Sequence, residues 1–278
     1  MTHAVLRASI VVIGDEILGG FVRDTNSGWL AGRLRTLGVP LDRIATVPDD
    51  PAAIDESLRA ELARARPRVL LTSGGIGSTP DDVSLEAVAA TLGRRLVVEP
   101  TIDARIGAAI ARSAGQGAPV GKAQADSMRK MALVPEGAYL LGATASFAPG
   151  VAVDVDGGAT GPWGATVVVL PGIPAELRRV TLDTVEPRLL RGRGRPVHVV
   201  EITHGYPESA LNPVLQRLVA DFADVHVGSY PGRECTVRLA GATARVEQAA
   251  TAVRDYLAAL DARPGSERQR AAWGRRWS

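Results

Sequence analysis

The residues best suited to chemistry lie between positions 68 and 84, where Gly74, Gly75 and Gly77 are followed by the pair Asp81 and Asp82. Glycine lets the backbone come close to a ligand, so this turn can point main-chain N–H groups at a phosphate. Two carboxylates beside a phosphate would repel it unless a divalent cation lies between them, and ligation by oxygen alone suits Mg²⁺. The stretch therefore predicts a phosphate site with a cation held by Asp81 and Asp82.

A purely structural role for the same residues is the alternative. Turns that lead from a strand into a helix favour glycine, and an aspartate in the first turn of a helix often only complements the helix dipole. In either interpretation Thr79 caps this helix and Pro80 occupies its first turn. We favour the metal-linked interpretation, because the two carboxylates follow a loop that otherwise suits anions.

Two further polar loops follow apolar runs that are typical of buried strands. The run at 9–13 ends in one loop, and the run at 166–170 leads into a proline-rich turn and a helix, whose N-terminus favours anions. Taken alone, this second loop is equally well explained as a tight turn held by two prolines. The candidate ligand-binding residues of all three loops are Gly14, Glu16, Asp24, Asn26, Ser73, Gly74, Gly75, Gly77, Thr79, Pro171, Gly172, Pro174 and Glu176.

The elements that must position these loops alternate along the chain. Strands are predicted at 9–13, 41–47 and 69–71, and helices at 26–37 and after Pro51, where apolar residues recur every three or four positions. This alternation favours an α/β fold with a parallel sheet and right-handed crossovers. Ligands of such sheets bind beyond the carboxyl ends of the strands, so we expect the loops at 14–24, 48–50 and 73–82 to lie together.

The chain is predicted to contain two domains. The stretch Arg-Gly-Arg-Gly-Arg at 191–195 is typical of a linker, which places a larger domain at 1–190. Residues 196–262 show the order β-α-β-β-α of a small α+β domain. Residues 263–278 are rich in arginine, and we expect them to be a disordered basic tail.

The composition is that of a globular protein, with 46% hydrophobic and 22% charged residues and a net charge of +2. A charge so close to balance gives no support to nucleic-acid binding. Cys235 is the only cysteine, so an intrachain disulfide is impossible and a reducing cytoplasm is the expected compartment. No apolar run approaches the length that spans a bilayer, so we expect no membrane association.

The motifs Gly14-Asp-Glu-Ile-Leu18, Gly74-Gly-Ile-Gly-Ser-Thr-Pro-Asp-Asp82 and Leu170-Pro-Gly-Ile-Pro174 occur in this order over about 180 residues. In them the sequence resembles the molybdopterin-binding MoaB/Mog domain family, and most of all its CinA-type branch and the related domain of eukaryotic FAD synthases. The resemblance implies a Rossmann-like three-layer α/β/α domain followed by a small α+β domain.

The resemblance also implies roles for particular residues. The glycine loop would hold a phosphate or a pterin phosphate, and the acidic residues after it, Asp81 and Asp82, would help to place a divalent metal such as Mg²⁺. Asp24 and Asn26 match a polar pair in the first loop. Lys130 matches a lysine that precedes the Leu-Val-Pro stretch, and with Asp81 and Asp82 it completes the candidate catalytic set. At the end of a predicted helix, Lys130 is otherwise explained as a solvated cation.

Three functions remain open from the sequence. The first is hydrolysis, dependent on a divalent metal, of a nucleotide pyrophosphate such as ADP-ribose or FAD. The second is adenylyl transfer to molybdopterin, and the third is binding of a pterin or nucleotide without catalysis. We expect a small-molecule nucleotide or pterin phosphate as partner, possible use of molybdopterin as a ligand, and a homo-oligomer. The amidase activity of longer CinA proteins is not expected, because little sequence follows residue 262.

Overall fold

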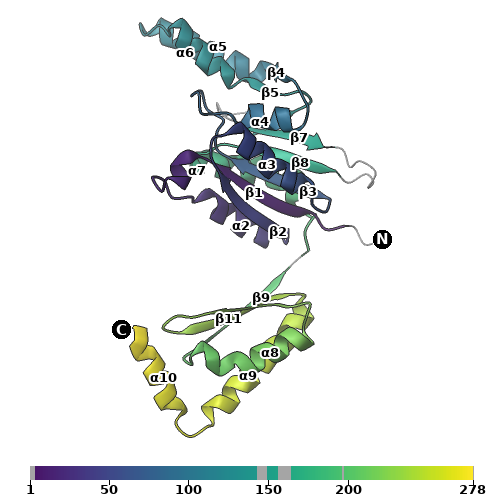
Figure 1. The fold of residues 1–278 in the computed structure, drawn as a ribbon, viewed down its shortest axis with the longest axis vertical. Helices are drawn as coiled ribbons and strands as arrows, with labels where there is room; N and C mark the ends of the chain where they lie inside the picture. Colours follow the sequence, from purple (N-terminus) through teal and green to yellow (C-terminus); the bar gives the residue numbers. More distant parts are fainter. Residues whose placement is uncertain (1–3, 143–148, 156–163, 196, 278) are drawn as a thin grey trace. The chain divides into compact units, whose positions relative to one another are not determined.

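The computed structural model describes residues 4–142, 149–155, 164–195 and 197–277. They form two compact units, and the boundary along the chain falls between Arg195 and Pro196. Figure 1 shows the first unit in purple to green and the second in green to yellow. Each unit has its own hydrophobic core. Within the described residues, no helix is both long and apolar enough to cross a membrane.

The first unit is built on a six-stranded sheet with the strand order β2-β1-β3-β8-β7-β6. The strands are β1 (Arg7–Ile13), β2 (Leu41–Val47), β3 (Arg68–Ser73), β6 (Tyr139–Leu141), β7 (Gly150–Val155) and β8 (Ala165–Leu170). The four strands β2, β1, β3 and β8 pair in parallel, whereas β7 and β6 run antiparallel to their neighbours. The predicted parallel sheet is confirmed.

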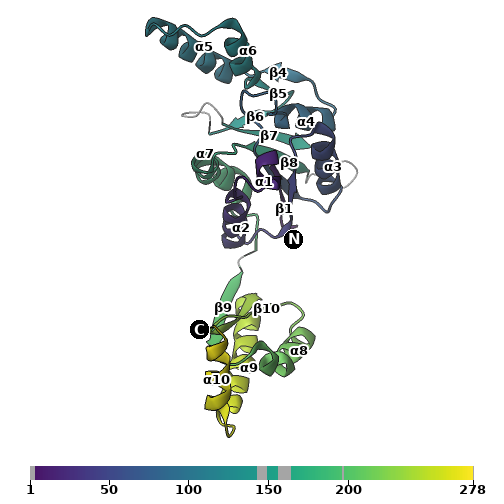
Figure 2. The same cartoon turned by 60° about the vertical axis from the view of Figure 1, so that its left-hand side comes forward.

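Helices cover both faces of this sheet (Figure 2). The helices of the first unit are α1 (Asp15–Leu18), α2 (Asn26–Thr36), α3 (Pro51–Leu62), α4 (Ser84–Thr91), α5 (Pro100–Gly115), α6 (Lys122–Lys130), α7 (Pro174–Val180) and the π-helix η2 (Thr181–Leu190). Alternate residues of β1 serve the two faces: Ile10 belongs to the core under α2 and α7, and Val11 to the core under α3 and α4. The three-layer α/β/α architecture is therefore confirmed.

The remaining elements of this unit extend the α4 side. A short antiparallel pair, β4 (Leu96–Val98) and β5 (Leu133–Pro135), frames the helices α5 and α6. Both views show α5 and α6 running side by side away from the six-stranded sheet. The chain leaves the sheet layer through α5 and returns through α6. Because α6 ends just before β5, and β5 contacts α4, the end of α6 lies near α4.

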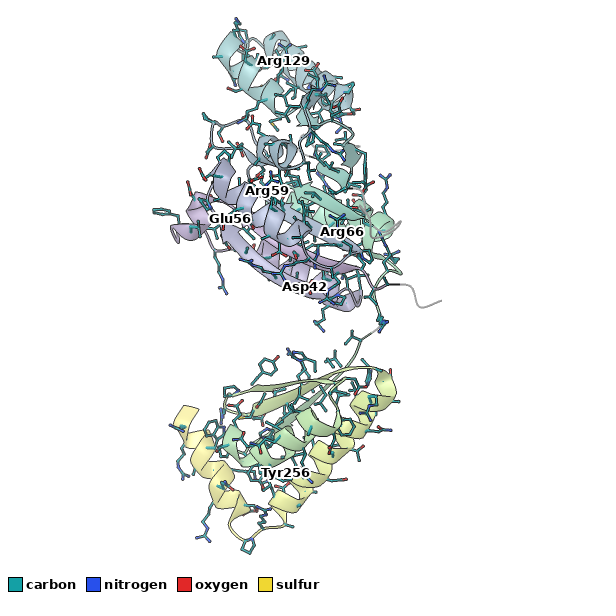
Figure 3. All side chains as sticks on the ribbon, turned by 45° about the vertical axis from the view of Figure 1, so that its right-hand side comes forward. Asp42, Glu56, Arg59, Arg66, Arg129 and Tyr256 are labelled. Atoms are coloured by element: carbon teal, nitrogen blue, oxygen red, sulfur yellow. The ribbon has the colours of Figure 1, made fainter. Side chains whose placement is uncertain are left out.

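Buried charges hold together the amino ends of the central strands. Arg68 at the start of β3 is 2% exposed, and its Nη2 lies 2.5 Å from Oδ2 of Asp42, which is labelled in Figure 3. The Nη1 of Arg68 also donates to the Ser9 hydroxyl at 2.7 Å, and Ser9 donates to buried Glu61 at 2.5 Å. Pairing of this kind is what allows charged groups to be buried. It fixes the edge of the sheet away from the predicted site.

The second unit is a small α+β domain, as predicted. Its sheet has the order β10-β11-β9, with all neighbours antiparallel, and Cys235 is a buried core residue of it. The elements are β9 (His198–His204), η3 (Glu208–Leu211), α8 (Asn212–Asp221), β10 (His226–Tyr230), β11 (Cys235–Gly241), α9 (Thr243–Asp261), α10 (Ser266–Gly274) and η4 (Arg275–Trp277).

Two expectations about the domain ends were wrong. The expected linker at 191–195 is bonded to the first unit, because the amide of Arg195 donates to Gly38 and Arg193 accepts from Leu6. The expected disordered tail contains the helix α10 in its described part. There the Ser266 hydroxyl donates to the carbonyl of Asp261 at 3.0 Å, which ties the start of α10 to the end of α9.

Candidate functional site

The carboxyl ends of β1, β2, β3 and β8 meet at one edge of the sheet, and backbone hydrogen bonds join the loops that leave them. The amide of Gly14, after β1, donates to Val47 at the end of β2. The amide of Gly74, after β3, donates to Leu170 at the end of β8. The expected gathering of the strand-end loops is therefore confirmed, and it includes the proline-rich loop after β8.

Asn26 is the side chain that links these loops. It begins α2, is 8% exposed, and donates its Nδ2 hydrogens to the Ser73 hydroxyl at 3.0 Å and to the Gly172 carbonyl at 2.7 Å. The Ser73 hydroxyl in turn donates to the carbonyl of Pro171 at 3.4 Å. One amide side chain thus joins the loops that follow β1, β3 and β8.

A cleft opens beside Asn26. It encloses about 400 Å³ of empty space, including its part open to solvent. Its lining consists of Val12, Ile13, Glu16, Ile17, Val22, Arg23, Asp24, Thr25, Asn26, Ser73, Gly74, Gly172 and Pro174. Among the described residues nothing donates to Asn26 Oδ1, although this oxygen is buried. A buried acceptor without a donor is costly unless water or a ligand supplies one.

The glycine loop passes very close to its neighbours. Gly74 has φ +106°, and a Cβ there would lie 2.2 Å from the carbonyl oxygen of Ile13. A Cβ on Gly172 would lie 3.3 Å from Gly74 Cα, so the loops after β3 and β8 touch at two glycines. Glycine is therefore required at position 74 for the loop to pass over β1.

Three successive main-chain N–H groups of this loop are available. Within the part of the chain that the structure describes, the amides of Gly75, Ile76 and Gly77 have no hydrogen-bond acceptor. Successive free N–H groups form a concavity that suits an anion. The predicted phosphate-binding character of the loop thus has a geometric basis in its unpaired donors.

The expected helix start at Thr79 and Pro80 was wrong. Helix α4 begins at Ser84, whose hydroxyl donates to Gly74 and whose amide donates to Gly75. Thr79 instead donates its amide, at 2.9 Å, and its hydroxyl to the carboxylate of Asp82. This closes the segment 79–82 into a turn, because an aspartate carboxylate competes well for nearby backbone amides.

A second hollow borders the part of the glycine loop that follows Gly74. It is lined by Gly75, Ile76, Gly77, Asp82, Leu85, Glu86, Lys130, Met131 and Leu133. Lys130 reaches the loop from the end of α6, where its Nζ donates to the Thr79 carbonyl at 3.1 Å and lies 3.8 Å from Glu86. The solvated helix end is thus not its whole role, since Lys130 braces the turn at 79–82.

An acidic cluster flanks the same turn. Burial raises the pKa of the Asp49 carboxyl above its ordinary value, and the amide of Asp15, which donates to Asp49 at 2.8 Å, partly opposes this. The negative charges of Glu16, Asp15 and Asp81 raise the pKa of Asp49 further. In contrast, the polar Thr79 side chain, the backbone amide of Asp81 itself and the nearby Lys130 lower the pKa of Asp81, although the Thr79 hydroxyl donates its one hydrogen to Asp82.

Asp49 is a site residue that the sequence-based set of candidates lacks. Its loop at 48–50 was expected at this edge, but nothing in the sequence distinguishes Asp49 from Asp50, which accepts from the Ala53 amide and caps α3. Only the structure shows that Asp49 turns toward the glycine loop, where its Oδ1 would lie 3.5 Å from a Cβ on Gly75.

The carboxylates fit a divalent cation that is shared with a ligand. In the described residues, no three side chains of His, Cys, Asp or Glu are grouped so that they alone could hold a metal ion. The charge of Asp81 nevertheless raises the pKa of Asp49 beside the free amides of the glycine loop. Mg²⁺ commonly binds through one or two carboxylates, with phosphate oxygens and water completing its shell.

Some of the remaining candidate residues line the cleft beside Asn26 and others do not. Glu16, Gly172 and Pro174 line the cleft, as expected for ligand-binding residues, whereas Gly14, Pro171 and Glu176 are not part of its lining. Asp24 lines the cleft, but its carboxylate also accepts from the amides of Asn26 and Ser27 at 2.9 and 3.0 Å and so fixes the start of α2.

Known proteins are similar to this chain in sequence and in fold. A family model described as "Probable molybdopterin binding domain" matches residues 9–191. A CinA-like protein of Mycolicibacterium vanbaalenii is 41% identical over 228 residues, which cover 78% of this chain and 51% of that protein. A protein of Thermococcus kodakarensis is 36% identical over 225 residues, which cover 81% of this chain and 85% of that protein.

The chain therefore spans about half the length of the Mycolicibacterium relative and most of the Thermococcus one. Among solved structures, the protein CinA from Thermoplasma acidophilum, described as of unknown function, aligns with a TM-score of 0.51 and 27% identity. The alignment covers 63% of this chain and 94% of that one.

Proposed function

The chain belongs to the family of probable molybdopterin binding domains, and we propose that it hydrolyses nucleotide pyrophosphates such as ADP-ribose or FAD with the help of a divalent metal. The observation that carries the proposal is the loop at 75–77, whose three amides have no acceptor among the described residues. Donors fixed in this way stabilise the charge that develops on phosphate oxygens during cleavage, and they need no rearrangement to do so.

In this reaction different residues of the first unit would bind the phosphate, position the turn at 79–82 and hold the cation. The amides of Gly75, Ile76 and Gly77 bind a phosphate, while Lys130 and Asp82 hold the turn that follows in place. Asp49 and Asp81 would hold the cation on the side of the acidic cluster. When bound, a divalent cation neutralises phosphate oxygens and lowers the pKa of an attacking water.

Adenylyl transfer is the second candidate, and the pair of hollows favours it. Gly74 lines the cleft beside Asn26, and Gly75, Ile76 and Gly77 line the hollow beside Lys130, so successive residues of the glycine loop border both. Two ligands, such as a pterin and a nucleotide, would thus meet at this loop. In that case a phosphorylated acceptor takes the place of water, and the same residues serve the transfer.

Incubation with ADP-ribose or FAD and Mg²⁺, Mn²⁺ or Co²⁺ tests the proposal, with products separated by chromatography. Hydrolysis predicts AMP from either substrate with at least one metal, and Asp81→Asn should lower the rate by about 10²-fold or more. Transfer predicts that AMP appears on a pterin acceptor only when ATP and the pterin are both present. Tight binding of ligands that remain unchanged after long incubation would contradict both reactions.

A further inference from the structure

Arg23 is a cation of the cleft that the motifs did not single out. It lies in the loop between α1 and α2 and lines the cleft together with Asn26 and Gly74. Across the described residues Arg23 has no hydrogen-bond, ion-pair or ring partner. Arg33, an arginine of α2 in the same unit, is in contrast paired with Glu186 at 2.6 Å. An unpaired guanidinium in a ligand cleft is free to bind an anion.

The two carboxylates that line the cleft, Glu16 and Asp24, form no ion pair with Arg23 in the described structure. Asp24 is adjacent in the chain, but its two oxygens accept from Asn26 and Ser27 at the start of α2. The second cation of the region, Lys130, lines the other hollow and is engaged with Thr79 and Glu86. Arg23 is therefore the cation that lines this cleft within the described part of the chain.

Asn26, which also lines the cleft, has a buried side-chain oxygen to which no described residue donates a hydrogen bond. Asn26 is more than nine-tenths buried, both its amide hydrogens are used, and its Oδ1 lacks a donor among the described residues. A ligand that satisfied both groups would bring an anionic oxygen to Arg23 and an N–H or O–H to Asn26. Sugar phosphates and nucleotides combine these two features in one molecule.

We propose that Arg23 is the phosphate-binding and specificity-determining residue of the cleft, and that it selects ligands with a diphosphate next to a hydrogen-bond donor for Asn26 Oδ1. The inference rests on the proposed function and extends it, because it assigns the second phosphate of a pyrophosphate to Arg23 while the first binds the amides at 75–77. Arginine suits this role since its planar fork can donate two parallel hydrogen bonds to one phosphate.

Isothermal titration calorimetry with two probes, both with Mg²⁺ present, tests the assignment. The probes are inorganic pyrophosphate and an ADP-ribose analogue in which a methylene group replaces the bridging oxygen of the diphosphate, so that it cannot be hydrolysed. Arg23→Gln should raise the Kd of both probes by about tenfold to a hundredfold, as expected for a lost charge-assisted hydrogen bond. It should also make the Kd depend less steeply on salt, because a screened charge contact is gone. Arg23→Lys should recover part of the affinity. Arg35→Gln is the matched control, since Arg35 is an exposed arginine of α2.

Several outcomes would overturn the assignment. Equal Kd values for the wild type and Arg23→Gln contradict the role of Arg23 and leave the proposed function intact. A raised Kd with an unchanged salt dependence also contradicts it, because it indicates an indirect structural effect. If the wild type binds neither probe, the proposed function fails together with the inference.

Discussion

At the scale of single residues, Asn26 explains how separate loops form one site. Its amide group is the shared partner of the Ser73 hydroxyl and the Gly172 carbonyl, and its oxygen is left for a ligand. The same side chain therefore contributes to stability before ligand binds and to affinity afterwards. Substitutions at this position should affect both quantities.

Asn26→Ala should lower the free energy of unfolding by about 1–3 kcal/mol, because it leaves buried Ser73 and the Gly172 carbonyl without their donor. Urea denaturation monitored by circular dichroism measures this loss. Asn212→Ala, at an exposed position at the start of α8, serves as the control and should have little effect. An unchanged midpoint for Asn26→Ala would show that the three loops are held without it.

The raised pKa of Asp49 leads to a prediction about pH. A cation binds the ionised carboxylate, so affinity for the cation should fall as pH is lowered through this raised pKa, before an ordinary aspartate would be protonated. In the absence of a cation, the free energy of unfolding changes with pH in the opposite direction, because Asp49 is then more stable in its protonated form. The stability that Asp49 contributes is complete below its unfolded pKa and is lost as pH rises through the folded one.

The increase in Tm caused by Mg²⁺ should accordingly be larger at about pH 7 than at about pH 5. Asp49→Asn should make this increase small at both values of pH. Asp50→Asn keeps a side-chain oxygen that can cap α3 and provides a control on the neighbouring residue. If the Mg²⁺ effect has the same size in Asp49→Asn as in the wild type, Asp49 does not take part in cation binding.

At the scale of elements, the glycine loop joins β3 to α4 by passing over the end of β1. Gly74→Ala should lower the free energy of unfolding by about 2–4 kcal/mol and abolish ligand binding, because a Cβ at φ +106° meets the Ile13 carbonyl. Thermal unfolding and titration with ADP-ribose measure the two effects.

Gly32→Ala is the matched control for this substitution. Gly32 lies inside α2, where nothing would come within 4 Å of its Cβ, so alanine should stabilise the protein by about 0.5–1 kcal/mol. Equal behaviour of the two variants would mean that the close approach of the glycine loop to β1 does not matter for the fold or for binding.

The sequence alone predicts the elements better than it predicts the turns between them. The strands β1, β3 and β8 follow from continuous apolar runs, and the start of α3 follows from Asp50 and Pro51. The start of α4 was misjudged because Thr79 has two uses: it can cap a helix or donate to Asp82, and the second prevails here. The choice between these two uses depends on the contacts of Ser84 with Gly74 and of Lys130 with Thr79, which a local sequence pattern does not show.

For the site, too, the sequence predicts one part and leaves another part to the structure. Glycines and carboxylates at strand ends could be identified as candidates, since the parallel topology fixes their edge of the sheet. The direction of a particular side chain could not, and this is why Asp49 and Arg23 were absent from the candidates. The helix α10 depends on contacts with α9 and on Trp273, whose Nε1 donates to Gly232. The arginine-rich composition of residues 263–278 gave no indication of these contacts.

At the scale of the whole molecule, the two units divide the chain into a part with the candidate site and a part without it. Every residue that lines the cleft or the second hollow belongs to the first unit. The second unit has its own core around Val237 and Val253. The expected homo-oligomer stays a prediction, to be measured by light scattering of the full chain.

A protein that ends at Arg195 should therefore bind ADP-ribose with the Kd of the full chain. Both cores of the first unit lie entirely within residues 1–195, which supports independent folding of this part. Calorimetric titration compares the two proteins, and circular dichroism confirms that the shorter one is folded. A folded first unit with much weaker binding would show that residues after 195 contribute to the site.

The proposed reaction is cleavage of a pyrophosphate bond by water at the glycine loop, and a turnover of ADP-ribose in H₂¹⁸O with a divalent metal distinguishes it from adenylyl transfer and from binding alone. Mass spectrometry of the products should find one ¹⁸O atom in the phosphate of either AMP or ribose 5-phosphate, because a P–O–P bond breaks as one phosphorus gains the oxygen of water. Unlabelled products, or ADP-ribose that stays intact with every metal, would contradict the account.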